Sequence, residues 1–335
     1  MPEINEKYIL AGDIGGTKTN LGIFMRGAGR PILKILKTYP SGKYPDMESI
    51  LALFLREYPM PVHYACFGIA GPVHHGKCSV TNLPWEVSEA RLKKRFRLRH
   101  VQLINDLAAT AFAIPCLKKG ELYVINKGRA QKEGNLALIA PGTGLGESIV
   151  VRENGMYVPV SSEGGHVDFA PQNEQEVGLW RRLKIKYGHV SLERILTGQG
   201  LEDIYSFLVK SGAYKETGRI VKRMKDADPA AVISEEAIIG RSKSCKAALD
   251  IFVSILGGAA GNLALTGLTT GGVYVAGGIP PRILPKLRGR TFMSSFTAKG
   301  RFKGFLENMP VYVILNDKAA LVGAAIRAFE IADAL

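Results

Sequence analysis

Two glycine-rich turns in this chain have the composition of phosphate-binding loops. The first is Gly15-Gly-Thr17, which follows a carboxylate at Asp13, and the second is Gly142-Thr-Gly144. Glycine lets the backbone come close to a ligand and point successive N–H groups at it, and threonine adds a hydroxyl donor. Lys18 adds a positive charge, and Asp13 adds a carboxylate that could hold a hydrated Mg²⁺ ion. The chemistry that these residues suggest is the binding of a phosphate chain.

Each turn lies between two short apolar runs, as a turn between two β-strands would. The first turn lies within residues 8–25 and the second within residues 136–151. Neither is a Walker A loop or a Rossmann fingerprint, because both of those open a helix. One such turn would carry little weight, since glycine turns join strands in many proteins. One turn in each half of the chain indicates a duplicated domain that holds a single polyphosphate.

Asn105 and Asp106 lie where a buried strand, residues 101–104, runs directly into an alanine-rich helix. The simplest role for either residue is to cap that helix. A functional role is compatible with capping, because a carboxylate at a helix N-terminus stays ionised and keeps one direction.

Three further hydrogen-bond acceptors, Glu163, His166 and Glu193, lie in the second half of the chain. Glu163 and His166 belong to a glycine-jointed loop that also contains Asp168. These three residues could form a metal site, but no other histidine or cysteine has ligand spacing. Ser191 is expected to cap a helix that carries Glu193 in its first turn, where acidic residues are common in any case.

A pocket lined by these acceptors suits a ligand that is rich in hydroxyl groups, because carboxylates accept hydrogen bonds and cannot donate them. A sugar fits that description better than an organic acid does. Next to a phosphate clamp, the chemistry implied is transfer of a phosphoryl group from ATP to a sugar hydroxyl. Such a transfer needs positioning, charge neutralisation by Mg²⁺ and one base for the attacking hydroxyl.

Length and composition fit a two-domain protein. The 335 residues are enough for two cores, and 46% hydrophobic with 22% charged residues is ordinary for a globular chain. The four cysteines have neither zinc nor disulfide spacing, and the N-terminus does not resemble a signal peptide, so we expect a cytoplasmic location. Residues 251–281 carry no charge, yet their glycines favour a buried helix, a turn and the strand 273–276 over a membrane span.

The net charge of +14 raises the possibility of a nucleic-acid partner. The densest basic segment is residues 91–100, in which Leu92, Phe96 and Leu98 are spaced like the end of an amphipathic helix. The chain has no zinc-finger, RNP or clear helix-turn-helix signal. We therefore expect a solvated helix face and no nucleic-acid partner, with a positive field that attracts an anionic substrate such as ATP.

The order and spacing of these motifs resemble the bacterial glucokinases of the hexokinase and actin-like ATPase superfamily. A related repressor-and-kinase branch has a cysteine-rich zinc motif after its histidine, whereas the residues after His166 contain none, which places the resemblance in the zinc-free branch. The motifs that carry the resemblance, nearly end to end, are Gly12-Asp-Ile-Gly-Gly-Thr17, Thr81-Asn-Leu-Pro-Trp85, Ile104-Asn-Asp106, Gly142-Thr-Gly-Leu-Gly146, Glu163-Gly-Gly-His-Val-Asp-Phe-Ala-Pro171, Gly188-His-Val-Ser-Leu-Glu-Arg194, Val275-Ala-Gly-Gly-Ile279 and Lys299-Gly-Arg-Phe302.

The resemblance implies an α/β fold with two ribonuclease-H-like domains and an interdomain cleft. Residues 1–116 with 318–335 would form the small domain, and residues 117–317 the large one. Asp106 would be the catalytic base, and the residues that bind glucose would be Asn105, Asp106, Glu163, His166 and Glu193. Mg²⁺ would lie near Asp13. The turn after strand 273–276 would form the floor of an adenine pocket. The residues expected to bind ATP are Gly12, Asp13, Ile14, Gly15, Gly16, Thr17, Gly142, Thr143, Gly144, Gly277 and Gly278.

The expected activity is ATP-dependent phosphorylation of the 6-hydroxyl of D-glucose, the first step of glycolysis, by a homodimer without a membrane or nucleic-acid partner. A kinase for mannose, fructose or glucosamine, a donor other than ATP, and a sugar-sensing regulator without activity are the alternatives. A glycosidase that uses Asp106 and Glu163 would leave both glycine turns unexplained. A basic surface for RNA is the least favoured interpretation.

Overall fold

The computed structural model describes residues 7–215 and 217–335, which form two compact units. The described residues of unit 1 lie within Met1–Lys119, Tyr157–Pro159 and Asn316–Leu335. Unit 2 comprises Gly120–Met156 and Val160–Leu315. The boundaries expected from the sequence, after residues 116 and 317, lie close to these divisions, whereas the short segment Tyr157–Pro159 was not expected in unit 1.

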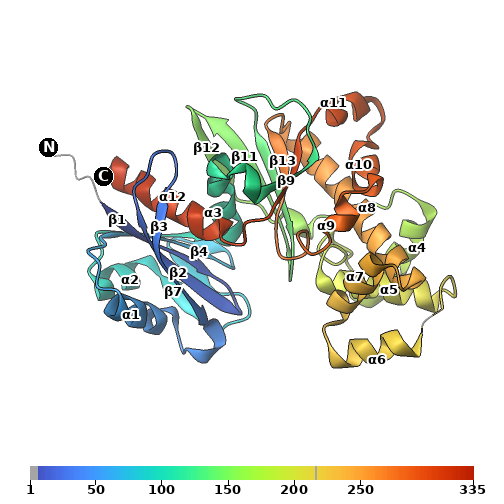
Figure 1. The fold of residues 1–335 in the computed structure, drawn as a ribbon, viewed down its shortest axis with the longest axis horizontal. Coiled ribbons are helices and arrows are strands. Elements are labelled where there is room, and N and C mark those ends of the chain that lie inside the picture. Colours follow the sequence, from blue (N-terminus) through green and yellow to red (C-terminus); the bar gives the residue numbers. More distant parts are fainter. Residues whose placement is uncertain (1–6, 216) are drawn as a thin grey trace. The chain divides into compact units, whose positions relative to one another are not determined.

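Unit 1 is built on a five-stranded sheet in the order β3-β2-β1-β4-β8 (Figure 1). The first three strands pair antiparallel, and β4 and β8 continue the sheet parallel to β1. Every residue of β4 is buried, as its unbroken apolar run predicts for a strand covered on both faces. The strands of this sheet are β1 (Tyr8–Ile14), β2 (Lys18–Met25), β3 (Ile32–Pro40), β4 (Tyr64–Ile69) and β8 (His100–Asn105).

The parallel part of this sheet brings three strand ends to one edge. Ile14 of β1 pairs with Ile69 of β4, and Ile69 pairs in turn with Asn105 of β8. Ligands of open α/β sheets bind outside the carboxyl ends of parallel strands. The register therefore places Asp13 and Asp106, which are far apart in the sequence, at the same edge of unit 1.

Helices from both ends of the chain cover this sheet. Helix α12, at the C-terminus, packs on β1, β4 and α3 (Figure 1). A methyl group on Gly323 of α12 would collide with the carbonyl oxygen of Ala109 in α3, so the two helices approach almost to backbone contact. The helices are α1 (Met47–Glu57), α2 (Glu89–Phe96), α3 (Asp106–Ala113) and α12 (Ala319–Ala334), and a small sheet contains β5 (Val73–His74), β6 (Lys77–Ser79) and β7 (Glu86–Ser88).

Unit 2 repeats the strand order of unit 1 in a six-stranded sheet, β12-β11-β10-β13-β14-β9. Its hairpin β10–β11 corresponds to β1–β2, and β13 and β14 follow parallel to β10 as β4 and β8 follow β1. Strand β9 is added antiparallel at the edge. This repeat confirms the duplicated domain that the two glycine turns predicted. The strands are β9 (Leu122–Asn126), β10 (Leu136–Pro141), β11 (Leu145–Glu153), β12 (Met156–Val160), β13 (Gly272–Val275) and β14 (Val311–Ile314).

The long uncharged segment forms the core helix α8, a turn and then strand β13, as predicted. By length and composition alone α8 could cross a membrane, but 72% of its most apolar stretch is buried inside the unit, as in the core helix of a soluble protein. The helices of unit 2 are α4 (Glu174–Tyr187), α5 (Gly198–Lys210), α6 (Gly218–Asp226), α7 (Pro229–Ile239), α8 (Lys243–Gly267), α9 (Leu284–Leu287), α10 (Arg290–Thr297) and α11 (Lys303–Glu307).

The helix expected to begin at Ser191 is not formed, and that prediction was wrong. Ser191 forms an isolated bridge with Asp168, residues 192–197 are turns and bends, and the next helix, α5, begins at Gly198. Ser191 caps only a single turn: its Oγ accepts the N–H of Arg194, and the next helix starts from its own cap, Thr197. The N–H of Leu192 donates to the carbonyl of Val167, and that of Glu193 donates to the carbonyl of Gly165. Glu193 therefore lies on a segment held against the preceding loop.

Candidate active site

The first phosphate turn joins β1 to β2 and is closed by its own backbone. The Gly15 N–H donates to the carbonyl of Lys18 at 3.0 Å. Ser41 fixes the turn from outside, because its N–H donates to the carbonyl of Thr17 and its hydroxyl to that of Gly15. No hydrogen bond from the N–H of Gly16 or Thr17 is found among the described residues. Those two groups, rather than Gly15, are the donors that the closed turn leaves without a backbone partner.

Glycine is required near this turn for space rather than for an unusual backbone conformation. Neither Gly15 nor Gly16 has a positive φ angle. A methyl group on Gly16 would lie 3.0 Å from the carbonyl oxygen of Thr81, and one on Gly12 would lie 2.5 Å from the ring of Phe67. The turn is thus packed closely on its neighbours, which holds its free N–H groups in place.

Asp13 is held at the end of β1 by the strand beside it. The amide of Asn20 donates to Asp13 Oδ2 at 3.0 Å, and Thr38 orients that amide by donating to Asn20 Oδ1 at 2.8 Å. Burial raises the pKa of Asp13, while Lys18 and Lys318 oppose this effect. Asp13 Oδ1 has no partner among the described residues. An oriented carboxylate with one free oxygen fits a hydrated Mg²⁺ ion, which commonly takes one or two carboxylates and keeps several waters.

Asn105 and Asp106 both accept a hydrogen bond from the same backbone group. The Leu107 N–H lies 2.9 Å from Asn105 Oδ1 and 2.8 Å from Asp106 Oδ1. Asn105 is the N-cap of α3, so the capping interpretation was right, and its Nδ2 also donates to the carbonyl of Gly71 at 3.2 Å. These contacts aim both side chains at the carboxyl edge of the sheet.

Two effects raise the pKa of Asp106 to about 6. The larger is burial, and the second is the negative charge of Asp13. Hydrogen bonds from the Leu107 amide and from Asn105 lower the pKa, but by less. A carboxylate with this pKa is ionised at neutral pH and is a better base than an ordinary aspartate.

The second phosphate turn joins β10 to β11 and is also closed by its backbone, because the Gly142 N–H donates to the carbonyl of Gly144 at 2.8 Å. The turn after β13 lies directly beside it. Gly277 has a φ of 88°, and a methyl group there would collide with the carbonyl oxygen of Pro141. A methyl group on Gly142 would lie 4.0 Å from the nitrogen of Gly278. The two glycine pairs predicted to bind the nucleotide are therefore neighbours.

Glu193 links the second phosphate turn to the loop that contains His166. Its Oε2 accepts the N–H of Leu145 at 2.9 Å, and a methyl group on Gly144 would lie 2.8 Å from the same oxygen. Its Oε1 lies 3.9 Å from His166 Nε2, and its N–H donates to the carbonyl of Gly165. The structure thus brings two of the predicted sugar-binding residues together at the end of the phosphate turn.

The side chains of Glu163, His166 and Asp168, which could have formed a metal site, do not come together. Asp168 pairs with His189 at 2.8 Å, while His166 faces Glu193. Glu163 is exposed on the same loop. Across residues 7–215 and 217–335, no three histidine, cysteine or acidic side chains are grouped as a metal ion would require.

Three residues that support the site were missed from the sequence. Asn20 pairs with Asp13 across the hairpin, so a hairpin register would have identified it. Ser41 and Lys318 gave no local signal, because Ser41 follows the third strand and Lys318 precedes the last helix. Only the folded chain brings them to the turn after β1.

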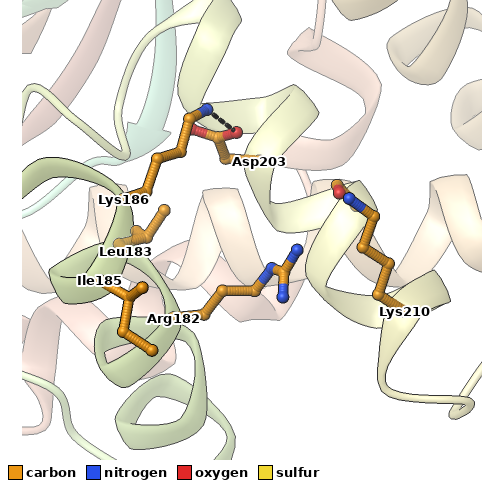
Figure 2. A pocket seen from close by; sticks show the side chains of 7 residues that line it. Arg182, Leu183, Ile185, Lys186, Asp203 and Lys210 are labelled. Carbon is orange, nitrogen blue, oxygen red and sulfur yellow. Dashed lines mark hydrogen bonds and ion pairs between the residues drawn. The ribbon is translucent and has the colours of Figure 1, made fainter.

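A pocket away from all these residues lies between α4 and α5 in unit 2 and has a volume of about 230 Å³. Figure 2 shows its basic side chains, one of which, Lys186, is paired with Asp203 at 2.6 Å. None of the residues predicted from the sequence lines it. Its lining residues are Arg182, Leu183, Ile185, Lys186, Asp203, Ser206 and Lys210.

The glucokinase family model matches residues 10–331 of the chain. The curated glucokinase of Trichormus variabilis is 38% identical over 334 residues, which cover 95% of this chain and 98% of the relative. That of Cronobacter sakazakii is 39% identical over 318 residues, covering 95% and 96% of the two chains.

The fold is also similar to that of a solved glucokinase structure. The crystal structure of a glucokinase from an Antarctic psychrotroph superposes with a TM-score of 0.87 at 31% sequence identity. The match covers 97% of this chain and 99% of that one. The residues described above in each of the two units lie inside the matched region of the family.

Proposed function

The chain belongs to the glucokinase family and catalyses the ATP-dependent phosphorylation of D-glucose, and we propose that Asp106 is the base of that reaction. The observation that carries this assignment is the geometry of the β8–α3 junction. The junction fixes the Asp106 carboxylate through the Leu107 amide, and burial raises its pKa to about 6. The proposed proton comes from the 6-hydroxyl of glucose, whose oxygen then attacks the γ-phosphoryl group.

The proposed sugar contacts are those expected from the sequence. Asn105 has an amide already oriented by its cap and by Gly71, and His166 and Glu193 form a pair on unit 2. Glu163 is exposed at the start of the same loop and would meet a further hydroxyl. Acceptor groups of this kind discriminate a hexose by its hydroxyl pattern, because an unmatched buried polar group is costly.

For the nucleotide, we propose that the N–H groups of Gly16 and Thr17 and the turn 142–144 bind phosphate oxygens, with Gly277 and Gly278 beside the second turn. Asp13 would hold a hydrated Mg²⁺ ion, which when bound would neutralise charge on the phosphate oxygens. Support comes from the free N–H groups of the first turn, from the free Oδ1 of Asp13 and from the packing of Gly277 on Pro141.

We expect Asp106→Asn to lower kcat by about 10²–10⁴-fold, because positioned proton transfer contributes about that factor. Glucose affinity should change little, since asparagine can still accept the Leu107 hydrogen bond. Asp333→Asn, at an exposed carboxylate of α12 that pairs with Arg26, is the matched control and should keep full activity.

The measurement is formation of the hexose 6-phosphate from glucose, mannose, fructose and glucosamine, with ATP and then with ADP or polyphosphate as the donor. Glucose with ATP should give the highest kcat/KM. An Asp106→Asn enzyme that turns over glucose at the rate of the Asp333→Asn control would remove Asp106 from the mechanism.

The finer expectations from the sequence also remain proposals: a cytoplasmic enzyme, a homodimer, and a role in the first step of glycolysis. They rest on the family to which the chain belongs. Light scattering on the purified chain would settle the oligomeric state, and a mass other than that of two chains would contradict it.

A further inference from the structure

Glu147 is a buried acidic residue in β11 with no role in the assignments above. Its side chain is 6% exposed, and the residue pairs with Ile139 of the neighbouring strand β10. Acidic side chains are seldom buried to this extent unless they are paired. The Glu147 Oε1 atom is enclosed, and no hydrogen-bond partner for it is found in the described part of the chain.

The other carboxylate oxygen lies against the loop that carries the proposed sugar contacts. A methyl group on Gly164 would lie 2.6 Å from Glu147 Oε2 and 3.0 Å from Glu147 Cβ. The Gly164 N–H donates away from Glu147, to Ser162 Oγ at 2.9 Å. The Glu147 side chain thus packs against Gly164 of the loop and receives no hydrogen bond from it.

This loop has little freedom to move without disturbing the sugar contacts. A methyl group on Gly165 would collide with the carbonyl oxygen of Leu145, so the loop rests directly on the start of β11. The carbonyl of Gly165 accepts the N–H of Glu193, and the carboxylate of Glu193 accepts the N–H of Leu145. A shift at Gly164 would therefore be transmitted to Glu163, His166 and Glu193.

Protonation of Glu147 changes how well its carboxyl group tolerates this dry contact with the loop. An ionised carboxylate without a partner is strongly disfavoured in such a site, whereas the neutral acid is tolerated. Burial accordingly raises the pKa of Glu147 from 4.5 to about 7, with no other cause. Near neutral pH the carboxyl group is therefore divided between its two forms, and the ionised form favours any arrangement that admits water.

The elements that border β11 contribute no charge that changes this balance. Strand β10 has no titratable residue between Leu136 and Pro141. Burial alone accounts for the shift in the pKa of Glu147, so no neighbouring charge is close enough to oppose it. The titratable side chains of the other bordering elements are Glu163 and His166 of the loop, Tyr157 of β12, and Lys243, Cys245, Lys246 and Asp250 of α8.

We propose that Glu147 is a positioning residue for the loop 162–166, and that glucose binds more tightly when the Glu147 carboxyl group carries a proton. This inference rests on the proposed sugar contacts of that loop. Bound glucose packs the loop more firmly on Glu147 and excludes water, which favours the neutral acid. Glucose binding then takes up a proton, and affinity falls as pH rises above neutrality.

The test is calorimetric titration of glucose into the enzyme, without nucleotide, between pH 6 and 8.5. If binding raises the pKa of Glu147 by one unit, affinity should fall about sevenfold across this range. Glu147→Gln, which cannot ionise, should bind glucose about as tightly at pH 8.5 as the wild type does at pH 6. Glu153→Gln removes an exposed carboxylate from the same strand and should follow the wild-type curve.

Any contribution of His166 persists in Glu147→Gln, so the difference between the two curves isolates Glu147. A second measurement needs no variant: wild-type titrations at pH 7.5 in two buffers of different ionisation enthalpy should reveal uptake of a fraction of a proton. A Glu147→Gln variant with the wild-type pH dependence, or a wild type that takes up no proton, would overturn the inference. The sugar contacts themselves are tested separately, because Glu193→Gln should weaken glucose binding at every pH.

Discussion

Asp106 owes its pKa of about 6 to two neighbours of different kinds: the protein that surrounds it and the Asp13 carboxylate. Both disfavour its ionised form, and both follow from the register that brings β1 and β8 to one edge of the sheet. The same features that make Asp106 a stronger base therefore make it costly to keep ionised. Removing the Asp106 carboxylate should therefore lower the activity and raise the free energy of unfolding.

The rate should depend on the protonation of Asp106. Below pH of about 6 its carboxylate gains a proton and cannot accept another, so kcat/KM for glucose should fall about tenfold per pH unit on the acid side. Above pH of about 7 Asp106 is fully ionised and causes no further change, so any decline there comes from Glu147 and should be absent in Glu147→Gln. A pH–rate profile from pH 5 to 7.5 measures the acid limb, and a midpoint near 4 would show that the pKa of the base is not raised.

Stability should improve when the Asp106 charge is removed. A carboxyl group whose pKa rises from 3.8 in the unfolded chain to about 6 in the folded one binds protons more tightly when folded. The free energy of unfolding therefore falls as pH rises from 3.8 to 6, because the folded protein holds this proton and the unfolded chain releases it. Above pH 6 the destabilisation by the ionised carboxylate stays constant. At pH 7.5 we expect Asp106→Asn to raise the free energy of unfolding by about 1–2 kcal/mol, after allowance for partial exposure. Urea unfolding at pH 7.5 and at pH 4, where the gain should vanish, decides this.

At the scale of elements, two helix packings differ in a way that glycine substitutions reveal. Gly323 in α12 faces the Ala109 carbonyl of α3 with no room for a methyl group, whereas nothing lies within 4 Å of a methyl group on Gly258 in α8. Alanine favours both helices by about 1 kcal/mol over glycine. The packing of the neighbouring element decides which effect wins.

We therefore expect Gly323→Ala to lower the free energy of unfolding by about 1–3 kcal/mol or more, because α12 must move away from α3. Gly258→Ala should raise it by about 0.5–1 kcal/mol. Chemical unfolding of the two variants beside the wild type measures both changes. Equal effects of the two substitutions would mean that α3 and α12 are not in such close contact.

For the whole molecule, the excess of 44 basic over 30 acidic residues should act on substrates of different charge differently. ATP is an anion and glucose is neutral, so the positive field should assist only the nucleotide. Raising the ionic strength from about 0.05 to 0.5 M shortens the Debye length well below 10 Å and should raise KM for ATP several-fold. KM for glucose in the same buffers is the internal control. A parallel rise of both constants would point to a general effect of salt on the fold.

Much of the architecture could be predicted from the chain because it depends on short-range patterns. The apolar runs around each glycine turn specify hairpins, and the motif after residue 104 specifies a strand that enters a helix, as β8 and α3 confirm. The helix expected at Ser191 was wrong because Ser191 caps only a single turn, and the helix that follows starts from its own cap, Thr197. A capping residue predicts that a turn begins, but it does not determine how far a helix continues.

The sequence by itself determined the chemistry on offer: glycine turns for phosphate, a carboxylate at a helix start, and acceptors for a sugar. The tertiary structure alone decided which of these groups meet. Strand register brings Asp13 and Asp106 to one edge, and the bond from the Glu193 N–H to the Gly165 carbonyl holds Glu193 beside Leu145. It also decided protonation, since the pKa of Asp106 and that of Glu147 depend on burial. Residue type sets what a group can do, but its distance from water and from other charges is set by packing between segments far apart in the chain.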